Sequence, residues 1–143
     1  MAHESRIVAV WRERLTFDAM TSAGLVVTMD AGVAHGGDDR GPSPMEMLLI
    51  ALAGCAGRTV LDILHKKREP VQGLEVAVAG TRADTHPKVF THINMAFRIA
   101  GDVKPESVER AIHLAEAKYC PVSIMLAETA VMSHRFEVVR GQL

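Results

Sequence analysis

The sequence contains little cysteine and few aromatic residues, and both shortages narrow its chemistry. Only two of its 143 residues are cysteine, and no CxxC or CxxH spacing surrounds them, which argues against a structural zinc site. Aromatic residues make up 4% of the chain, whereas methionine occurs eight times. We therefore predict a core of aliphatic and thioether side chains, a composition that suits an adaptable pocket as well as simple packing.

The chain also lacks an excess of positive charge. Its formal net charge is −1, which argues against nucleic acid as a partner, because binding to phosphates needs a strong basic excess. The first residues show no basic segment followed by an apolar one, as a signal peptide would, so we expect a cytoplasmic protein. The longest apolar run, residues 45–57, contains Glu46 and is predicted to be too short to cross a membrane.

Length and composition predict one globular domain over residues 1–143. Hydrophobic residues make up 48% of the chain and charged residues 23%, which describes an ordinary folded protein. Apolar patterns and breaker residues predict strands over 5–13, 15–20 and 25–29, a helix over 43–68, strands over 74–83 and 89–99, helices over 105–119 and 121–127, and a strand over 134–140. This order favours an α+β fold over alternating βαβ units.

The segment Ser43-Pro44-Met45-Glu46 predicts the start of the long helix. Serine suits the cap, proline suits the first turn, and Glu46 completes a capping box in which each end satisfies a backbone N–H of the other. The first half of the helix is apolar nearly all round, so we expect it to be buried on most sides. Its charged second half is expected to reach solvent.

A flexible, glycine-rich loop is predicted over residues 31–42. Its glycines do not form a GxxxxGK[ST] motif, so phosphate binding is only weakly indicated. Loops of this length inside a compact domain are often functional. The histidines of the chain share no metal-binding spacing, and we predict no metal site.

The two cysteines have different local settings. Cys55 lies in the apolar helix among small residues, where burial would raise the pKa of a thiol unless a cation reaches it. Cys120 precedes Pro121 and is expected near the N-cap of the next helix, where free N–H groups favour a thiolate. By local sequence alone, Cys120 is therefore the predicted nucleophile. The alternative is that both are unrelated buried thiols, since a lone cysteine in an apolar helix is usually only a small hydrophobic residue.

Four arginines are candidates for the cation beside Cys55. Arg12 and Arg14 lie in the predicted first hairpin, Arg40 lies in the glycine-rich loop, and Arg58 follows Cys55 by three positions on a neighbouring face of the helix. The alternative reading is that the hairpin arginines are simply solvated, and that Glu46 serves only as a capping residue.

Several segments resemble motifs of one protein family. The run Gly41-Pro-Ser-Pro-Met-Glu-Met-Leu-Leu-Ile-Ala-Leu-Ala-Gly-Cys55 is similar to the helix signature of the OsmC/Ohr family, the osmotically inducible and organic-hydroperoxide-resistance proteins. The triplet Tyr119-Cys120-Pro121 resembles the second cysteine motif of that family. The residues that fit its N-terminal hairpin are Trp11, Phe17, Gly24 and Asp30. The resemblance spans nearly the whole chain and indicates a divergent, OsmC-like branch.

The resemblance implies both a fold and an activity. The implied fold is an OsmC-like α+β protomer with an N-terminal antiparallel meander, a long buried central helix, a hairpin, a second helix pair and a C-terminal strand, assembled as an intertwined homodimer. The implied activity is that of a thiol peroxidase without a bound cofactor. Cys55 attacks an organic hydroperoxide and becomes a sulfenic acid, Cys120 closes a disulfide, and an external dithiol, for example one of lipoyl type, restores both thiols.

The resemblance also implies supporting residues. It assigns the activating cation to an arginine of the N-terminal hairpin, for which Arg14 fits best, and the carboxylate that orients it to Glu46. In the family this glutamate directly follows the proline, whereas here Met45 takes that place, and one residue rotates a helical side chain by about 100°. Two other readings stay open: a non-catalytic dimer that binds a small hydrophobic ligand, and a thiol redox sensor or a detoxifier of electrophiles.

Overall fold

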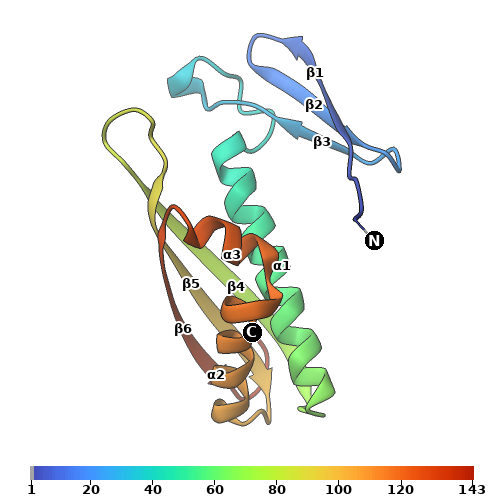
Figure 1. Ribbon diagram of the computed structural model, residues 1–143, viewed down its shortest axis with the longest axis vertical. Helices are drawn as coiled ribbons and strands as arrows, with labels where there is room; N and C mark the ends of the chain where they lie inside the picture. Colours follow the sequence, from blue (N-terminus) through green and yellow to red (C-terminus); the bar gives the residue numbers. More distant parts are fainter. Residues whose placement is uncertain (1) are drawn as a thin grey trace. The chain divides into compact units, whose positions relative to one another are not determined.

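The computed structural model describes residues 2–143 (Figure 1). Its elements are β1 (Ile7–Glu13), β2 (Thr16–Thr21), β3 (Val26–Met29), the 3₁₀ turn η1 (Val33–His35), α1 (Pro44–Lys66), β4 (Val71–Arg82), β5 (Phe90–Gly101), α2 (Pro105–Leu114), the π-helical segment η2 (Ala115–Tyr119), α3 (Pro121–Ala127) and β6 (Val131–Val139). This order confirms the predicted α+β fold. The chain divides after Leu48 into two compact units, and the prediction of a single domain stays a prediction.

The N-terminal unit is built on a three-stranded antiparallel sheet. Its strands pair in the order β1-β2-β3, with Trp11 opposite Phe17 and Phe17 opposite Met29. Gly24 turns the chain between β2 and β3 with a φ of 83°, a left-handed conformation that glycine adopts without strain. The predicted meander is confirmed.

This N-terminal sheet leaves much apolar surface exposed within the single chain. Trp11 is 62% exposed. The other exposed apolar side chains of the strands and their turns are Ile7, Val8, Leu15, Phe17, Met20, Leu25, Val26 and Val27. Monomeric soluble proteins rarely leave apolar surface of this extent in contact with water. The sheet is therefore a candidate contact surface.

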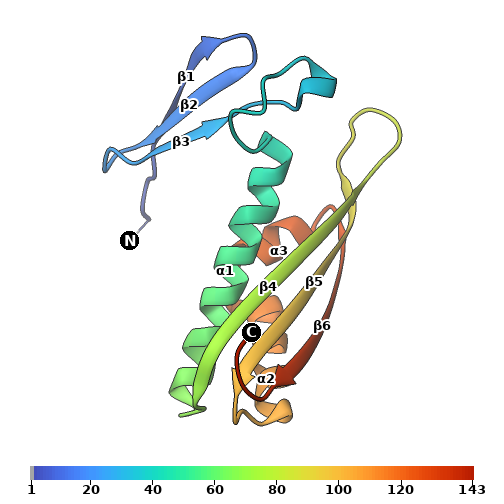
Figure 2. The ribbon, with the colours of Figure 1, turned by 180° about the vertical axis from the view of Figure 1, so that it is seen from behind.

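The C-terminal unit is a sheet with helices packed on one face. The hairpin partners β4 and β5 pair antiparallel over their whole length, and β6 then pairs parallel to β5. A parallel pair needs a crossover, which α2, η2 and α3 supply. In Figure 1 α2 and α3 lie in front of the sheet, and in Figure 2 they lie behind it, so both helices cover the same face.

The core of this unit follows the predicted periodicities. The apolar side of β5 contributes four buried side chains, Ile93, Met95, Phe97 and Ile99. The inner stripe that was predicted for the helix over 105–119 is also buried, with its members at helical spacing in α2 and at the start of η2: Val108, Ala111, Ile112 and Ala115. Across the core, α1 presents a buried stripe at every fourth residue, Leu52, Ala56, Val60 and Leu64. Period two on the strand and period 3.6 on the helices therefore meet in one aliphatic core.

The expectation that the first half of α1 is buried on most sides is wrong for the single chain. Leu48 is 41% exposed and Ile50 is 51% exposed. Among residues 2–143, burial of this helix is confined to one stripe, and its other apolar side chains remain uncovered. By length and composition alone α1 is also long enough to cross a membrane, because the helix extends well beyond the apolar run of residues 45–57. The core helix of a soluble protein has the same properties.

Candidate active site

Cys55 lies on α1 and is half-buried. Small neighbours give its thiol room. A side chain at Gly54 would meet nothing within 4 Å, whereas Gly57 packs so closely that a Cβ there would lie 3.2 Å from Val76 Cγ2. The two glycines thus have different roles: Gly57 lets β4 pack closely against the helix, and Gly54 leaves open space beside the thiol. Cys55 opens on a groove of about 750 Å³ that Tyr119 and Pro121 also line.

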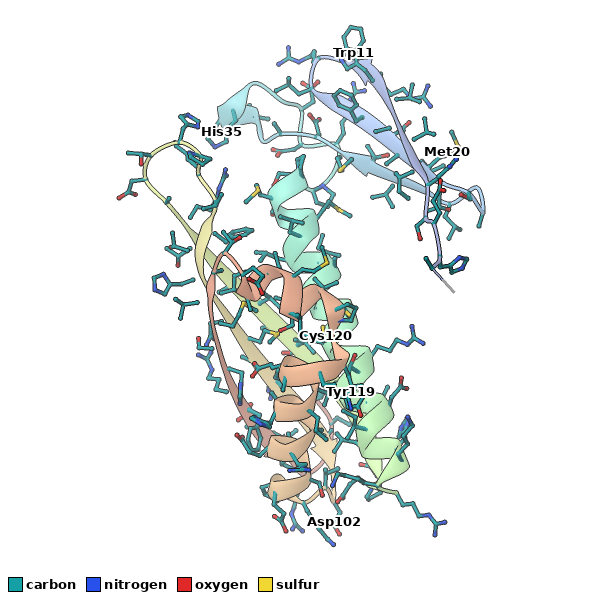
Figure 3. The ribbon with its side chains drawn as sticks, viewed as in Figure 1. Trp11, Met20, His35, Asp102, Tyr119 and Cys120 are labelled. Carbon is teal, nitrogen blue, oxygen red and sulfur yellow. The ribbon has the colours of Figure 1, made fainter. Side chains whose placement is uncertain are left out.

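Cys120 lies where the helical chain between α2 and α3 changes direction. The η2 segment makes a wider turn than an α-helix, and the backbone N–H of Cys120 donates to the carbonyl of Ala115 at 2.8 Å. Pro121 then starts α3. The sequence predicted an ordinary helix to residue 119, and nothing in the local residue pattern marks the π-helical turn. Such turns are frequent at functional sites. Figure 3 shows Tyr119 and Cys120 on this segment, alongside α1.

Cys120 lies at the predicted N-cap of α3, but its pKa does not shift in the predicted direction. Its sulfur accepts a hydrogen bond from the backbone N–H of Ser123 at 3.5 Å, as expected at the N-cap of α3. The thiol is nevertheless fully buried, and burial, together with the adjacent Cys55 thiol, outweighs this donor and raises the pKa of Cys120 to about 11. The expectation that the cap favours the Cys120 thiolate is therefore not met, because desolvation of a thiolate costs more than one cap donor returns.

The two cysteines lie side by side although they are far apart in the sequence. The Cys55 thiol is close enough to Cys120 to be one of the causes of the raised pKa of Cys120. Both thiols are free. They also differ in access, since one is half-exposed at a groove and the other has no contact with solvent. An oxidant that enters the groove can reach Cys55, and Cys120 is then the next sulfur available.

Arg14 lies in the N-terminal unit, in the turn between β1 and β2. It has a φ of 47°, which is a strained region for a residue other than glycine. The indole N–H of Trp11 donates to the Arg14 carbonyl at 2.9 Å and holds this turn. The guanidinium lies 3.2 Å from the Asp38 carboxylate and donates to the Gly36 carbonyl at 2.8 Å. Among residues 2–143, both partners of the guanidinium are therefore supplied by the glycine-rich loop.

Glu46 forms the capping box that the sequence predicted. Its carboxylate accepts from the Ser43 backbone N–H at 3.0 Å, and its own N–H donates to the Ser43 hydroxyl at 3.1 Å. These contacts with Ser43 lower the pKa of Glu46. Among residues 2–143 the carboxylate bound to Arg14 is that of Asp38, a residue that sequence reasoning did not single out. The other three candidate arginines pair as Arg12–Asp18, Arg40–Glu13 and Arg58–Asp62.

Asp30 organises the loop that holds Arg14. It is 2% exposed and accepts four hydrogen bonds, from the backbone N–H groups of Ala31, Asp38 and Arg40 and from the hydroxyl of Thr16. Burial opposes ionisation, but these donors outweigh it and lower the pKa of Asp30. The loop predicted as flexible is thus anchored around a buried carboxylate.

Two glycines let this loop close on itself. A Cβ at Gly37 would lie 1.9 Å from the carbonyl oxygen of Ala31, and one at Gly41 would lie 2.2 Å from that of Thr28. No side chain fits at either position without moving the backbone. The glycine content of the segment therefore reflects close backbone packing. It is the sequence signal that could have indicated an ordered loop.

Comparisons with known proteins agree on one family. The family model described as OsmC-like protein matches residues 36–135. The chain is 40% identical over 130 residues to Protein YhfA of Escherichia coli (strain K12), across 90% of this chain and 94% of that protein. An OsmC-like protein from Mycoplasma pneumoniae superposes with a TM-score of 0.84 at 22% identity, over 97% of this chain and 99% of that chain.

A second solved structure carries a functional name. The organic hydroperoxide resistance protein from Elizabethkingia anophelis superposes with a TM-score of 0.78 at 13% identity, over 97% of this chain and 99% of that chain. At this identity, and at that of the Mycoplasma protein, the likeness shows the fold alone.

Proposed function

The chain belongs to the OsmC-like protein family, and on that premise we propose that it is a thiol-dependent peroxidase that reduces organic hydroperoxides. The observation that carries the proposal is the pairing of a half-exposed Cys55 with a buried, protonated Cys120. Solved proteins of the same fold are named organic hydroperoxide resistance proteins. A pair of cysteines that served only as packing would not need one sulfur open to a groove.

The proposed reaction divides into three balanced steps. The Cys55 thiolate attacks one oxygen of the hydroperoxide, the O–O bond breaks, and the alcohol leaves after taking up a proton, so that Cys55 becomes a sulfenic acid. The Cys120 sulfur then attacks the Cys55 sulfur, and water leaves as the disulfide forms. An external dithiol reduces this disulfide by exchange and is itself oxidised to a disulfide. No bound cofactor takes part.

The raised pKa of Cys120 supports this division of roles. A thiol that stays protonated at neutral pH is a poor nucleophile, so it does not compete with Cys55 for the peroxide. Once Cys55 is a sulfenic acid, the Cys120 sulfur is already adjacent, and proximity can replace intrinsic reactivity. The Cys120 proton leaves with the departing hydroxide as water.

We assign the activating cation to Arg14 and its orientation to Asp38. A guanidinium lowers the pKa of a nearby thiol and stabilises the charge that develops on the leaving oxygen. In this chain Asp38 takes the orienting role that the family resemblance gives to Glu46, since Asp38 binds the guanidinium and Glu46 is engaged by Ser43. Asp30 fixes the backbone of the same loop and acts through it.

We further propose that the working form is a homodimer in the cytoplasm. The exposed apolar side chains of the β1–β3 sheet and of the first half of α1 need a cover, and a second copy of the chain supplies one of matching character. Sedimentation equilibrium tests the assembly, and a monomer at micromolar concentration would contradict this part.

Peroxide turnover with intact mass measurement tests the activity. Substoichiometric t-butyl hydroperoxide should give one disulfide, seen as the loss of two hydrogens. The Cys120→Ser variant should instead accumulate a Cys55 sulfenic acid that dimedone traps. If Cys55→Ser consumes peroxide as fast as the wild type, the proposal fails. If the wild type itself consumes no peroxide, the groove beside Cys55 favours the second candidate function, a dimer that binds a small hydrophobic ligand without catalysis.

A further inference from the structure

A histidine that the proposed reaction does not use lies beneath the helical segment that carries Cys120. His134 belongs to β6 and pairs with Met95 of β5 in the parallel register. Paired residues of neighbouring strands point to the same side of a sheet, and Met95 is fully buried. His134 therefore lies on the side of the sheet that α2 and α3 cover (Figures 1 and 2), with its side chain 20% exposed.

The His134 ring meets two glutamates of the covering helices. Its Nδ1 lies 2.9 Å from Oε1 and 3.1 Å from Oε2 of Glu116, and it donates, because a carboxylate can only accept. Its Nε2 lies 3.7 Å from Glu109 Oε1. The two carboxylates meet opposite nitrogens of the ring, which cannot both face one ion, so the cluster is not a metal site. Glu109 is 57% exposed and Glu116 only 24%, which makes the Glu116 contact the stronger one.

Glu116 belongs to the π-helical segment η2, which has little other anchorage through its side chains. Ala115 at the start of η2 is buried, whereas residues 117–119 are exposed. Within residues 115–120, Glu116 is therefore the one side chain between the two buried ends that is held against the sheet. Its contact with His134 fixes the middle of this segment to β6.

The π-helical turn decides which way the Cys120 thiol faces. The turn closes where the Cys120 N–H donates to the Ala115 carbonyl at 2.8 Å, across Glu116. A π-turn holds one residue more than an α-turn, so relaxation to α-helical geometry would rotate the following side chain by about 100° around the helix axis. Such a rotation would carry the Cys120 sulfur away from the Cys55 sulfur, which now lies beside it.

We propose that His134 is a positioning residue for the Cys55–Cys120 disulfide: it holds Glu116, and through it the π-helical turn, so that the Cys120 sulfur stays beside Cys55. His134 touches neither sulfur and acts through the backbone of η2. The inference rests on the proposed function only in treating this disulfide as a catalytic intermediate. The positioning itself needs no peroxide.

Equilibration with glutathione tests the positioning in the absence of peroxide. One oxidised glutathione converts the two thiols to a disulfide and is itself reduced to two glutathione thiols. His134→Ala should lower the equilibrium constant of this exchange about tenfold, because the two sulfurs are no longer held together; a tenfold change raises the reduction potential of the disulfide by about 30 mV. Glu116→Ala should have the same effect. The double variant should be no weaker than either single variant, since both remove one contact.

Control variants separate positioning from stability. His92→Ala removes an exposed imidazole from the neighbouring strand β5 and should leave the reduction potential unchanged. Ile112→Val removes a buried methyl group from α2 and should lower the temperature of unfolding without changing the potential. His134→Asn keeps an N–H donor near the place of Nδ1 and should restore most of the wild-type potential. Glu116→Ala changes a partly exposed side chain, so it carries the same test if His134→Ala does not fold.

A single turnover with t-butyl hydroperoxide gives a kinetic measure of the same effect. In His134→Ala the first step at Cys55 should keep its wild-type rate, because Cys55 and its groove are unchanged. Closure of the disulfide should slow about tenfold, so that dimedone traps more of the Cys55 sulfenic acid. A folded His134→Ala protein with the wild-type potential and closure rate would overturn the inference.

The two proposals fail separately. A shifted glutathione equilibrium in His134→Ala, in a protein that does not consume t-butyl hydroperoxide, supports the positioning role and contradicts the peroxidase. Peroxide consumption with an unshifted equilibrium does the reverse. Fully additive effects of His134→Ala and Glu116→Ala would mean that the two residues act through separate contacts, and would also contradict the inference.

Discussion

The different reactivity of the two thiols is the sharpest prediction of this structure. Burial and the adjacent Cys55 thiol raise the pKa of Cys120 from an ordinary value of 9.0 to about 11. At pH 7 a thiol with that pKa is ionised in roughly one molecule in ten thousand, about a hundredfold fewer than at the ordinary value. Because only the thiolate is alkylated, and Cys120 is also shielded from solvent, its native reaction should be slower still.

Single-cysteine variants isolate each thiol for this measurement. We expect Cys120, in the Cys55→Ser variant, to react with iodoacetamide at least about one hundredfold more slowly at pH 7 than an unfolded sample of the same variant. Cys55, in the Cys120→Ser variant, should react readily. Intact mass spectrometry between pH 6 and pH 10 gives both rates. Removal of Cys55 should also lower the pKa of Cys120 somewhat, since the Cys55 thiol is one cause of its shift.

The alkylation rates of Cys55 and Cys120 in the native protein decide which of them is the better nucleophile. The unfolded samples serve as controls, because both thiols should then react at similar rates. If native Cys120 reacts faster than native Cys55 at pH 7, the local cap effect dominates over burial. The assignment of nucleophile and resolving residue would then be reversed.

Three further predictions concern the N-terminal unit. Asp38→Asn should lower kcat/KM for t-butyl hydroperoxide about tenfold, or roughly 1.4 kcal/mol, with little change in stability. Glu46→Ala should instead lower the free energy of unfolding, because it removes the carboxylate end of the capping box, and should leave kcat/KM unchanged; the opposite pattern would return the orienting role to Glu46. Asp30→Asn should lower the free energy of unfolding by about 1–3 kcal/mol at pH 7, as measured by urea unfolding. Because folding lowers the pKa of Asp30, this loss of stability should be complete above the ordinary pKa of 3.8 and should shrink as the pH falls below it. A loss that does not depend on pH would contradict the interpretation that Asp30 is ionised in the folded protein. Trp11→Glu should shift a sedimenting dimer towards monomer, and an unchanged dimer would place the interface elsewhere.

Local interactions are what the sequence determined. The capping box between Ser43 and Glu46 spans one helical turn, so the pattern of a few residues was enough to predict it. The element order and the apolar faces of β5 and α2 follow from periodicity within single segments. Even the hydrogen bond from Ser123 to Cys120 could be predicted, because an N-cap acts within its own first turn.

Interactions between distant segments needed the tertiary structure. Nothing near Asp38 in the sequence indicates that it binds Arg14, and the four donors around Asp30 come from two separate segments. The glycines that allow this closure were visible, but the backbone atoms they approach were not. Contacts of this kind depend on how the chain folds back on itself, and no local pattern encodes the partner.

The sequence by itself determined the fold class, the family and the identity of the two cysteines. Only the tertiary structure decided that the pKa of Cys120 is raised, because the pKa of a thiol depends on how deeply the fold buries it and on which charges and thiols surround it. The local cap at Cys120 favours a thiolate, and the folded core that encloses it favours the thiol. The core prevails, since desolvation acts on the whole ionised group whereas the cap supplies a single hydrogen bond.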